Sequence, residues 1–350
     1  MPQNIDSILD AAEQQEASDV FLQEDEVPRL KVNEQITVLG DERLSLALIT
    51  EFWRACGANP EGDMDRDSGF VSRTQTRYRV SLHRTMGRLG AVLRRIKTRV
   101  PSLKTLGLPE WLLTRWGARE HGLILITGPT GSGKSTTIAS LIQWMNENLV
   151  RHIVTIEDPV EYQFTSDRCH FTQRQIGRDT GTFATGLRSA LRQAPDVIFV
   201  GEIRDYETAL TALQASETGH LVVSTLHSER VADTMERYIN LFPSHDEKHG
   251  VNLLANQLSG VLCQKLVESA DGGLHLLVEH VENAGAMRDW IAKRELQNID
   301  QYLSRGSDPA AVSFLQSTLQ GLRTKAITEA TAMASVSNES ELRRAIRGIG

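Results

Sequence analysis

The chain has 350 residues, of which 40% are apolar, and its formal net charge is −7 with a sequence pI near 5.8. This length permits two domains with hydrophobic cores, and the acidic balance lacks the overall basic footprint of a nucleic-acid-binding protein. The three cysteines lie far apart with no C-x-x-C pair, which argues against a structural zinc site and for a reducing compartment.

The N-terminal segment is acidic and helical in pattern, unlike the basic and then apolar pattern of a signal peptide. The sequence contains no stretch of about 18 apolar residues that could span a bilayer. We therefore expect a cytoplasmic protein without direct membrane insertion.

The N-terminal part of the chain has the pattern of a small α+β domain. The predicted elements are a helix over residues 5–12, a strand over 19–23, a hairpin of PRLKVN and QITVL that turns at Asn33 and Glu34, a helix over 46–56 that ends at Gly57, and strands around 77–83 and 90–96. We place this domain at residues 1–98. A linker with two prolines follows at 99–108, and a second domain covers 109–350.

Two arginines of these strands have two open interpretations. In the stretch TRYRVSLHRT, apolar residues alternate with polar ones, so that Arg79 projects from the face opposite Val80. Arg79, and Arg94 on the next strand, could simply solvate an exposed sheet face. Alternatively, both could reach a phosphate bound to a neighbouring subunit, and charge alone does not decide between the two.

The stretch LILITGPTGSGKSTTIASLIQWM predicts a buried strand over 123–127, a glycine-rich turn and a helix. The turn fits the P-loop pattern G-x-x-x-x-G-K-[ST], which predicts a nucleoside triphosphate site. The glycines let the backbone approach the phosphates closely, the lysine neutralises charge on them, and the serine hydroxyl can ligate Mg²⁺. The expected nucleotide-binding residues are Gly128, Pro129, Thr130, Gly131, Ser132, Gly133, Lys134, Ser135 and Thr136.

The second half of the chain alternates strands and helices, which predicts an α/β fold with a parallel sheet covered by helices. The predicted strands are HIVTIE, VIFVGE and LVVSTL, and the predicted helices cover residues 184–193, 206–218 and 231–241. After Phe242 the pattern predicts an almost wholly helical segment.

Acidic residues and histidines follow the predicted strands. Glu202 comes just after VIFV, at a carboxyl end where ligands of open α/β sheets bind, and it could hold Mg²⁺ or polarise the attacking water. Glu157 and Glu161 follow HIVTI and could orient water or simply begin a helix. His220 and His227 bracket LVVSTL. We expect His227, at the carboxyl end, to sense the γ-phosphate, and we assign His220 to nucleotide binding.

Four sequence boxes occur in order: GPTGSGKST, TIEDPVEY, LRQAPDVIFVGEIRD and ETGHLVVSTLH. They resemble the Walker A, acidic, Walker B and His boxes of the secretion ATPase superfamily. More narrowly, the chain resembles the type IV pilus retraction ATPases over nearly its whole length, and most strongly from Gly122 to Pro243.

The resemblance implies a PAS-like N-terminal domain, a RecA-like P-loop ATPase domain with a helical C-terminal segment, and a homohexameric ring that uses ATP and Mg²⁺ to remove pilin from a fibre. It assigns nucleotide, magnesium and catalytic positions to Lys134, Ser135 and Glu202, which leaves Glu157 open as an alternative base. The acidic-box and His-box positions fall on Glu157, Glu161, His220 and His227. The segment YRVSLHRTMGRLGAVLRRI resembles the one whose arginines approach nucleotide across domains or subunits, which supports that interpretation of Arg79 and Arg94.

The resemblance also implies partners and alternatives. The expected partners are further copies of the chain, an inner-membrane pilus platform protein that holds it peripherally at the membrane, and a paralogous pilus ATPase, with no nucleic acid. Extension and secretion members usually carry a tetracysteine zinc insert, and the lack of one here favours retraction. The helix AMRDWIAKRE follows the AIRNLIRE motif of the main retraction enzyme only loosely, and LRQAPD together with the terminal ASVSNESELRRAI favours an accessory member. The alternatives are a type II or type IVB secretion or pilus-extension ATPase, and a nucleotide-binding subunit with little turnover.

Overall fold

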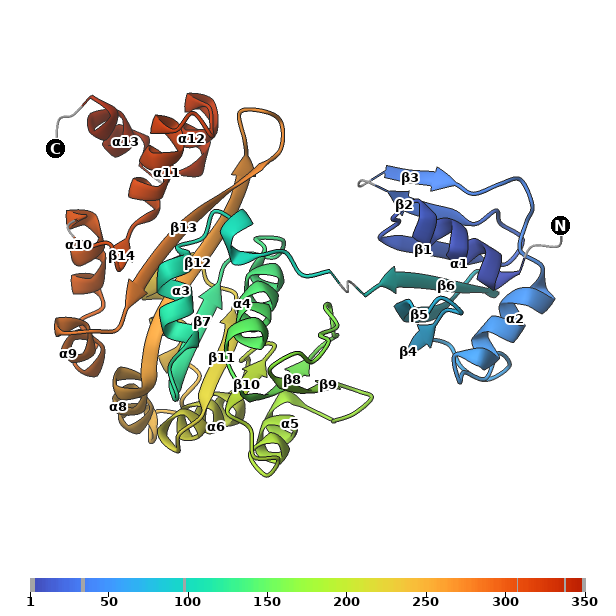
Figure 1. The fold of residues 1–350 in the computed structure, drawn as a ribbon, viewed down its shortest axis with the longest axis horizontal. Helices are drawn as coiled ribbons and strands as arrows, with labels where there is room; N and C mark the ends of the chain where they lie inside the picture. The colour runs from blue at the N-terminus through green and yellow to red at the C-terminus, as the bar shows by residue number, and fades with distance from the viewer. Residues whose placement is uncertain (1–3, 33–34, 97–98, 307, 337, 348–350) are drawn as a thin grey trace. The chain divides into compact units, whose positions relative to one another are not determined.

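The computed structural model describes residues 4–32, 35–96, 99–306, 308–336 and 338–347 (Figure 1). The chain divides into two compact units. Residues 1–98 make up most of the first unit, and residues 99–160 together with 164–350 form the second.

The first unit is built on a six-stranded antiparallel sheet with the strand order β3-β2-β1-β6-β5-β4. Its elements are α1 (Ile5–Gln14), β1 (Asp19–Gln23), β2 (Arg29–Val32), β3 (Gln35–Val38), α2 (Leu46–Ala55), β4 (Arg66–Val71), β5 (Arg77–Thr85) and β6 (Arg88–Arg95). The predicted β2–β3 pairing is confirmed, whereas its turn at Asn33 and Glu34 lies outside the described residues. Strand β4 was not predicted, because this exposed edge strand has no alternating apolar pattern.

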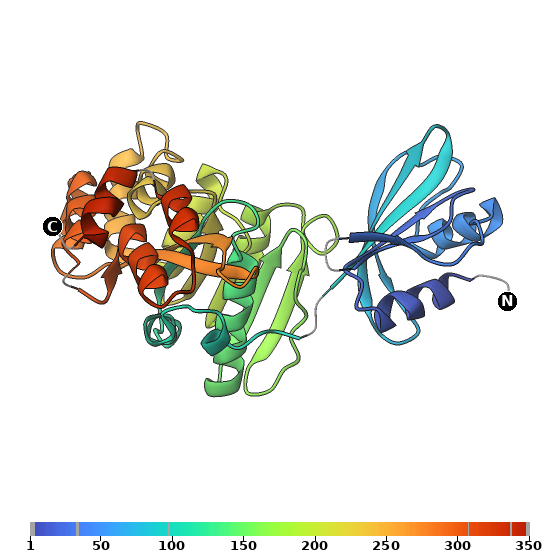
Figure 2. The same cartoon turned by 90° about the horizontal axis from the view of Figure 1, so that it is seen from above.

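Both helices of the first unit cover one face of its sheet (Figure 2). The apolar side of each strand, such as Val20 of β1 and Leu93 of β6, packs against apolar residues of α1 and α2 in one core. Trp53 of α2 is fully buried there, and its indole N–H donates to the Gly90 carbonyl at 3.1 Å. This bond matters because a buried indole N–H without an acceptor would destabilise the core.

The second unit contains an eight-stranded sheet with the order β14-β13-β12-β7-β11-β10-β8-β9. Neighbouring strands from β12 to β9 in this order run parallel, whereas β13 and β14 pair antiparallel. Its strands are β7 (Gly122–Thr127), β8 (His152–Glu157), β9 (His170–Gln175), β10 (Val197–Val200), β11 (Leu221–Leu226), β12 (Leu258–Glu268), β13 (Leu274–Glu282) and β14 (Ala311–Val312). Its helices are η1 (Leu103–Thr105), α3 (Glu110–Gly117), α4 (Lys134–Asn148), α5 (Phe183–Ala190), α6 (Tyr206–Glu217), α7 (Val231–Ile239), α8 (Glu247–Gln257), α9 (Ala286–Ala292), α10 (Gln297–Arg305), α11 (Phe314–Arg323), α12 (Glu329–Ser335) and α13 (Glu339–Ile346).

Helices cover both faces of this sheet (Figure 1). On one face, residues of β7, β8, β10 and β11 form one core with α5 to α8. The remaining residues of β7, such as Ile124, are buried on the opposite face, where α3 and α4 pack. Burial on both faces explains the continuous apolar runs of these strands, and the expected α/β architecture is confirmed.

One prediction about the C-terminal part is corrected. The segment after Phe242 is not almost wholly helical, because residues 258–268 and 274–282 form the long antiparallel pair β12 and β13. The first seven residues of β12 are all buried, so the strand lacks the alternation of buried and exposed residues that would distinguish it from a buried helix in the sequence. Elsewhere in this segment the predicted helical character is confirmed by α8 and by α9 to α13.

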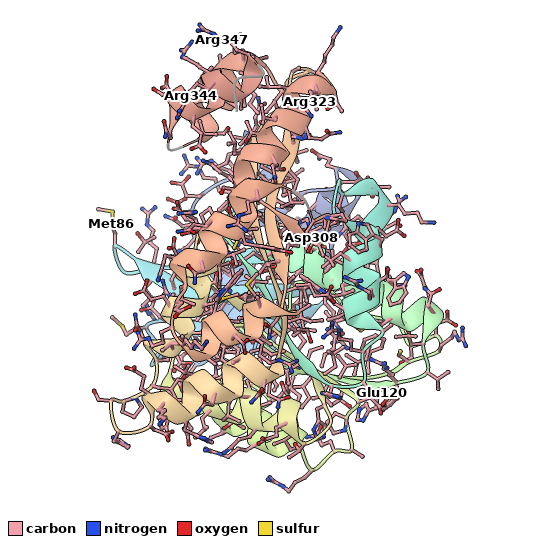
Figure 3. All side chains as sticks on the ribbon, turned by 90° about the vertical axis from the view of Figure 1, so that its left-hand side faces the viewer. Met86, Glu120, Asp308, Arg323, Arg344 and Arg347 are labelled. Carbon is pink, nitrogen blue, oxygen red and sulfur yellow. The ribbon has the colours of Figure 1, made fainter. Side chains whose placement is uncertain are left out.

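The helices α11 to α13 form a small core of their own against β13, built around Leu277, Ile327, Ala332 and Leu342. Arg323, Arg344 and Arg347 project into solvent in this region (Figure 3). No helix in the described ranges combines the length and apolar character needed to cross a bilayer. All three cysteines of the chain are reduced and buried.

Candidate functional site

The P-loop connects β7 to α4 and is shaped by glycines. Gly131 and Gly133 have φ values of +81° and +89°, in the left-handed region that glycine adopts without strain. Gly128 lies so close to the Gln264 backbone that a Cβ atom there would clash with the carbonyl oxygen. Gly133 is the N-cap of α4, so the N–H groups of the first helical turn and the positive end of the helix dipole lie at the loop.

The side chains of the loop surround this turn. Lys134 begins α4, and its ammonium donates to the carbonyls of Gly128 and Pro129 at 2.8 and 2.9 Å, which holds the charge over the loop. Ser135 and Thr136 follow in the first turn of α4 and are half-buried, whereas Pro129 and Thr130 are exposed. The Ser132 hydroxyl is buried and finds no hydrogen-bond partner among the described residues.

Glu202 lies beyond the carboxyl end of β10, the second strand from β7 in the sheet. At about 4.8 Å per strand this corresponds to roughly 10 Å from the strand that carries the P-loop. The Gly201 N–H donates to the Ile156 carbonyl of β8 at 2.8 Å, which extends the sheet up to Glu202. The Glu202 side chain is only 12% exposed, so water screens its interactions with nearby charges less than those of a surface carboxylate.

Two cationic or ionisable side chains contact the Glu202 carboxylate. Arg204 pairs with one oxygen at 2.7 Å, and His227 Nε2 lies 3.5 Å from the other. The bond to Glu202 and its negative charge raise the pKa of Arg204 above its ordinary value, so the guanidinium stays charged. The structure thus brings Glu202 and His227 together at the carboxyl ends of β10 and β11, as the sequence predicted for these two positions.

Glu157 is the last residue of β8, beside β10, and is buried. Its Oε1 accepts a hydrogen bond from the Thr155 hydroxyl at 2.6 Å and one from the Gln173 amide at 3.3 Å. These bonds fix the carboxylate on the edge that also carries Glu202. Glu161 lies further along the connection and is exposed.

His220 lies at the other end of β11 from His227. It precedes β11, whereas His227 follows it, and the six residues of β11 separate the two. At about 3.3 Å per residue the separation is roughly 20 Å, at the opposite edge of the sheet. The His220 Nδ1 is 3.0 Å from the Ala215 carbonyl, at the end of α6. Within one chain, therefore, the structure does not bring His220 to the P-loop.

Arg79 and Arg94 both belong to the first unit, where they are direct cross-strand neighbours on β5 and β6. Each pairs with an acidic residue of its own sheet. Arg94 Nε donates to Asp19 Oδ1 at 2.7 Å, and Arg79 lies 3.5 Å from Asp67. Asp19 is buried, but the Arg94 side chain is 68% exposed, so part of its guanidinium remains accessible.

The residues at the carboxyl edge of the sheet fit a Mg²⁺-bound nucleoside triphosphate. Apart from Gly131 itself and its two chain neighbours, no heavy atom of the described residues lies within 4 Å of the position that a Gly131 Cβ would take, so the loop backbone is open there. Lys134 supplies a positive charge, and the partnerless Ser132 hydroxyl is a further polar group of the loop. The Ser135 hydroxyl and the Glu202 carboxylate are hard oxygen ligands of the kind that Mg²⁺ prefers.

Three further residues at this edge were not predicted from the sequence. Arg204 follows Glu202 by two residues in GEIRD, a basic residue after an acidic one that could have suggested the pair. Thr155 alternates with Glu157 on β8, and period-two spacing could have placed both on one face. Gln173 had no signal, because its strand β9 was not predicted.

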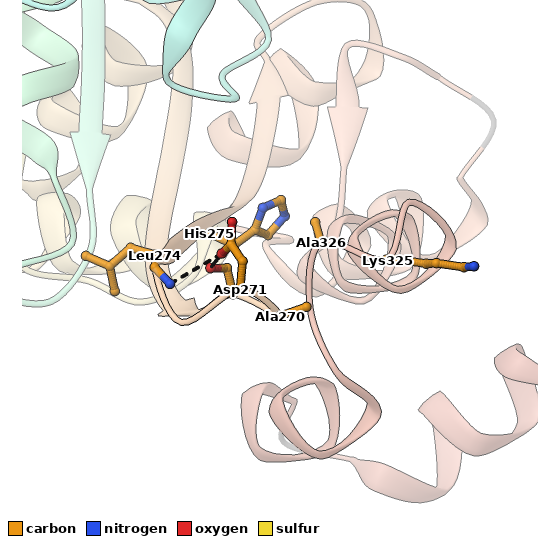
Figure 4. Close-up of a pocket in the computed structure, with 8 residues that line it drawn as sticks. Ala270, Asp271, Leu274, His275, Lys325 and Ala326 are labelled. Carbon is orange, nitrogen blue, oxygen red and sulfur yellow. Dashed lines mark hydrogen bonds between the residues drawn. The ribbon is translucent and has the colours of Figure 1, made fainter.

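A pocket of about 490 Å³ lies elsewhere, at the turn between β12 and β13 beside the connection from α11 to α12 (Figure 4). It is lined by Ser269, Ala270, Asp271, Gly273, Leu274, His275, Lys325 and Ala326. Asp271 accepts hydrogen bonds from the Ser269 hydroxyl and the Gly273 N–H, which close the turn locally. None of the predicted site residues lines this pocket, so it is separate from the candidate nucleotide site.

Comparisons with known proteins agree with the geometry. A family model described as "Type II/IV secretion system protein" matches residues 1–285. The chain is 34% identical to the type IV pilus ATPase PilU of Pseudomonas aeruginosa over 342 residues. This match covers 94% of this chain and 88% of that protein. It is 37% identical over 264 residues to the type IV pilus retraction ATPase PilT of the same organism, covering 75% of this chain and 76% of that protein.

The likeness extends to three dimensions. The crystal structure of the pilus retraction motor PilT with bound ADP aligns with a TM-score of 0.88 at 36% identity, covering 98% of this chain and 99% of that one. The expected fold class is therefore confirmed, with an antiparallel sheet unit before a RecA-like unit and C-terminal helices.

Proposed function

Because the chain belongs to the type II/IV secretion system protein family, whose members are ATPases, we propose that it is a homohexameric ring motor that powers type IV pilus retraction and twitching motility. The observation that carries the ATPase site is the contact of Glu202 with His227 beyond the carboxyl ends of β10 and β11, on the same edge of the sheet as the P-loop that follows β7. Similarity to PilU over 94% of this chain supports a pilus load for the motor.

In the proposed reaction, ATP binds with its phosphates on the P-loop. The loop N–H groups and the Lys134 ammonium bind the phosphate oxygens. Ser135 and Glu202 would hold Mg²⁺, which supplies charge neutralisation at these oxygens when bound. The positive end of α4 adds to the same field and requires no rearrangement during the reaction.

A water molecule then attacks the γ-phosphorus while the bond from this phosphorus to the β–γ bridging oxygen breaks, so that ADP leaves and inorganic phosphate forms. Glu202 orients this water and accepts its proton, with Glu157 as the alternative base on the neighbouring strand. His227, beside Glu202, responds to the γ-phosphate, while Arg204 restrains the carboxylate. In our proposal Arg79 and Arg94 reach the phosphates of a neighbouring subunit, and hydrolysis changes the angle between the two units.

We further propose that the ring works in the cytoplasm, held at the inner membrane by the pilus platform protein and assisted by a paralogous pilus ATPase. A second candidate is an accessory retraction ATPase. It is supported by the match to PilU, which covers more of this chain than the match to PilT. A type II or type IVB secretion or pilus-extension ATPase would use the same chemistry with another load.

Three measurements test the proposal. Purified chain should release phosphate from ATP in a Mg²⁺-dependent manner and should form hexamers with nucleotide at micromolar concentration. In the source bacterium, a deletion strain should accumulate surface pili without twitching. Bald cells would indicate extension instead, and normal twitching with reduced force would indicate the accessory role.

A further inference from the structure

Glu279 of β13 is a buried carboxylate that the proposed ATP hydrolysis does not use. Its residue surface is 3% exposed. It pairs directly with Cys263 of β12, and Cys263 pairs with Thr127, the last residue of β7 before the P-loop. Because in-register partners project to the same face of a sheet, Thr127, Cys263 and Glu279 form one polar row at the carboxyl end of β7.

Helix α7 is attached to this row at two points. The Val231 N–H, at the start of α7, donates to Glu279 Oε1 at 2.8 Å. One turn later, the Thr234 hydroxyl lies 3.1 Å from Thr127 Oγ1 and 3.6 Å from Cys263 Sγ. The N-cap residue Arg230 makes no side-chain capping bond, so Glu279 supplies from another strand the acceptor that a cap normally provides.

The start of α7 is linked to the catalytic edge. His227 lies four residues before Val231, and its carbonyl accepts a hydrogen bond from Arg237 of α7 at 2.9 Å. The imidazole of the same residue approaches Glu202. A displacement of α7 would therefore move the backbone that carries His227.

The second oxygen of Glu279 points to the C-terminal helices. The Phe314 N–H, the first of α11, donates to Oε2 at 3.4 Å. Arg230 pairs in addition with Asp300 of α10 at 2.7 Å. Burial raises the pKa of Glu279, while the N–H groups of Val231 and Phe314 and the charge of Arg230 favour its ionised form. One carboxylate thus bonds to the first residue of two helices that are far apart in the sequence.

We propose that Glu279 is a positioning residue that holds α7 against the strands of the P-loop, sets through α7 the place of His227 beside Glu202, and ties this arrangement to α11. The inference rests on the proposed function, because it assigns His227 a part in hydrolysis. If Glu279 served stability alone, replacing it would lower the free energy of unfolding but would not change how a His227 substitution affects kcat.

The test is a double-mutant cycle on the full chain with Glu279→Ala, His227→Ala and the double variant. Glu279→Ala should lower kcat for Mg²⁺-ATP about tenfold while the Kd of ADP changes less than about twofold, because the P-loop keeps its contacts. In the His227→Ala background, the same change should lower kcat less than about twofold. Thr328→Ala is the matched control. The Thr328 hydroxyl caps α12 by accepting a hydrogen bond from the Thr331 N–H at 3.1 Å. Its removal should leave kcat unchanged.

Glu279→Gln is a second variant in case Glu279→Ala does not fold, because the Gln side chain keeps one oxygen that can accept a hydrogen bond. It should show an intermediate kcat and the same dependence on His227. Independent effects of the two substitutions, an unchanged kcat in His227→Ala, or a lower melting temperature without a change in kcat would each overturn the inference. Absence of Mg²⁺-dependent hydrolysis by the wild-type chain would instead contradict the proposed function, and the inference would fall with it.

Discussion

The imidazole Nε2 of His227 lies 3.5 Å from Oε1 of Glu202, although the two residues follow different strands. The strands β10 and β11 are parallel neighbours, so their carboxyl ends meet at one edge. The other Glu202 oxygen pairs with Arg204 at 2.7 Å. The carboxylate is thus held from both sides, which gives a general base a fixed orientation.

Replacing Glu202 by Gln should abolish most ATP hydrolysis and leave nucleotide binding intact. The amide keeps the shape of the side chain but cannot accept a proton, and such a loss costs about 10²–10⁴-fold in kcat. Phosphate release and titration with a fluorescent ATP analogue measure the two effects. Glu207→Gln is the control, since this exposed acid pairs with Arg188 in a surface contact. An unchanged rate in Glu202→Gln would assign the base to Glu157.

Two glycines of the P-loop should respond differently to alanine. At Gly131 the new methyl group would meet no heavy atom of the described chain within 4 Å, so only the positive φ is unfavourable, at about 1–2 kcal/mol. At Gly128 the methyl group would also clash with the Gln264 carbonyl and the Ser132 side chain, which adds about 1–3 kcal/mol. Urea unfolding should therefore show Gly128→Ala as the less stable variant. Equal midpoints would contradict the close packing of the loop on β12.

Acidification should destabilise the chain through His280 of β13. Burial lowers the pKa of this imidazole below 6.5, partly offset by its bond to the Pro309 carbonyl and the charge of Asp308. Between the lowered pKa and 6.5 the unfolded chain binds more protons than the folded one, so the free energy of unfolding falls as the pH drops. From about pH 7.5 to about pH 5.5, His280→Gln should lose less stability than wild type. The exposed His121→Gln should follow wild type, and an equal loss in His280→Gln would exclude this cause.

Arg94 offers a test of catalysis between subunits. In our proposal Arg94→Ala lowers kcat because a neighbouring site loses a cation that stabilises the transition state. Mixed with Glu202→Gln, the variant should regain hydrolysis, since some sites then combine an intact Glu202 with an intact neighbouring Arg94. Arg73→Ala is the control, because this exposed residue pairs with Asp10 on the surface.

If Arg94 only solvates the sheet face, Arg94→Ala should give a different result. The guanidinium pairs with the buried Asp19, so its loss leaves a buried carboxylate bonded to the Ser18 hydroxyl. If Arg94 acts only in this pair, Arg94→Ala lowers the melting temperature and mixing restores no activity. The two results separate the interpretations that the sequence left open.

The P-loop and the parallel strands were predictable because their information is local. A run of apolar residues before GPTGSGKS predicts strand, turn and helix together, and β11 has the bounds that the pattern gave. The placement of Glu202 followed from the rule that ligands bind at carboxyl ends.

Long-range pairing was not predictable in the same way. The bond of Arg94 to Asp19 joins residues 75 positions apart, and nothing in either strand alone indicates it. The segment that contains β12 and β13 predicts helix because the buried first seven residues of β12 show no period of two. The position of Glu279 under two helix starts depends on these strands, so it could not be inferred without them.

The burial of every cysteine makes the chain convenient for site-specific labelling. Burial raises the pKa of Cys56 and of Cys263 to about 12 and raises that of Cys169, so in the folded chain these thiols stay protonated and unreactive. A cysteine introduced at Met86, which is fully exposed at the turn between β5 and β6 (Figure 3), would react selectively. A second one at Val150, 77% exposed, would allow a dye or spin-label pair to follow the distance between the two units through ATP turnover, with the native cysteines left in place.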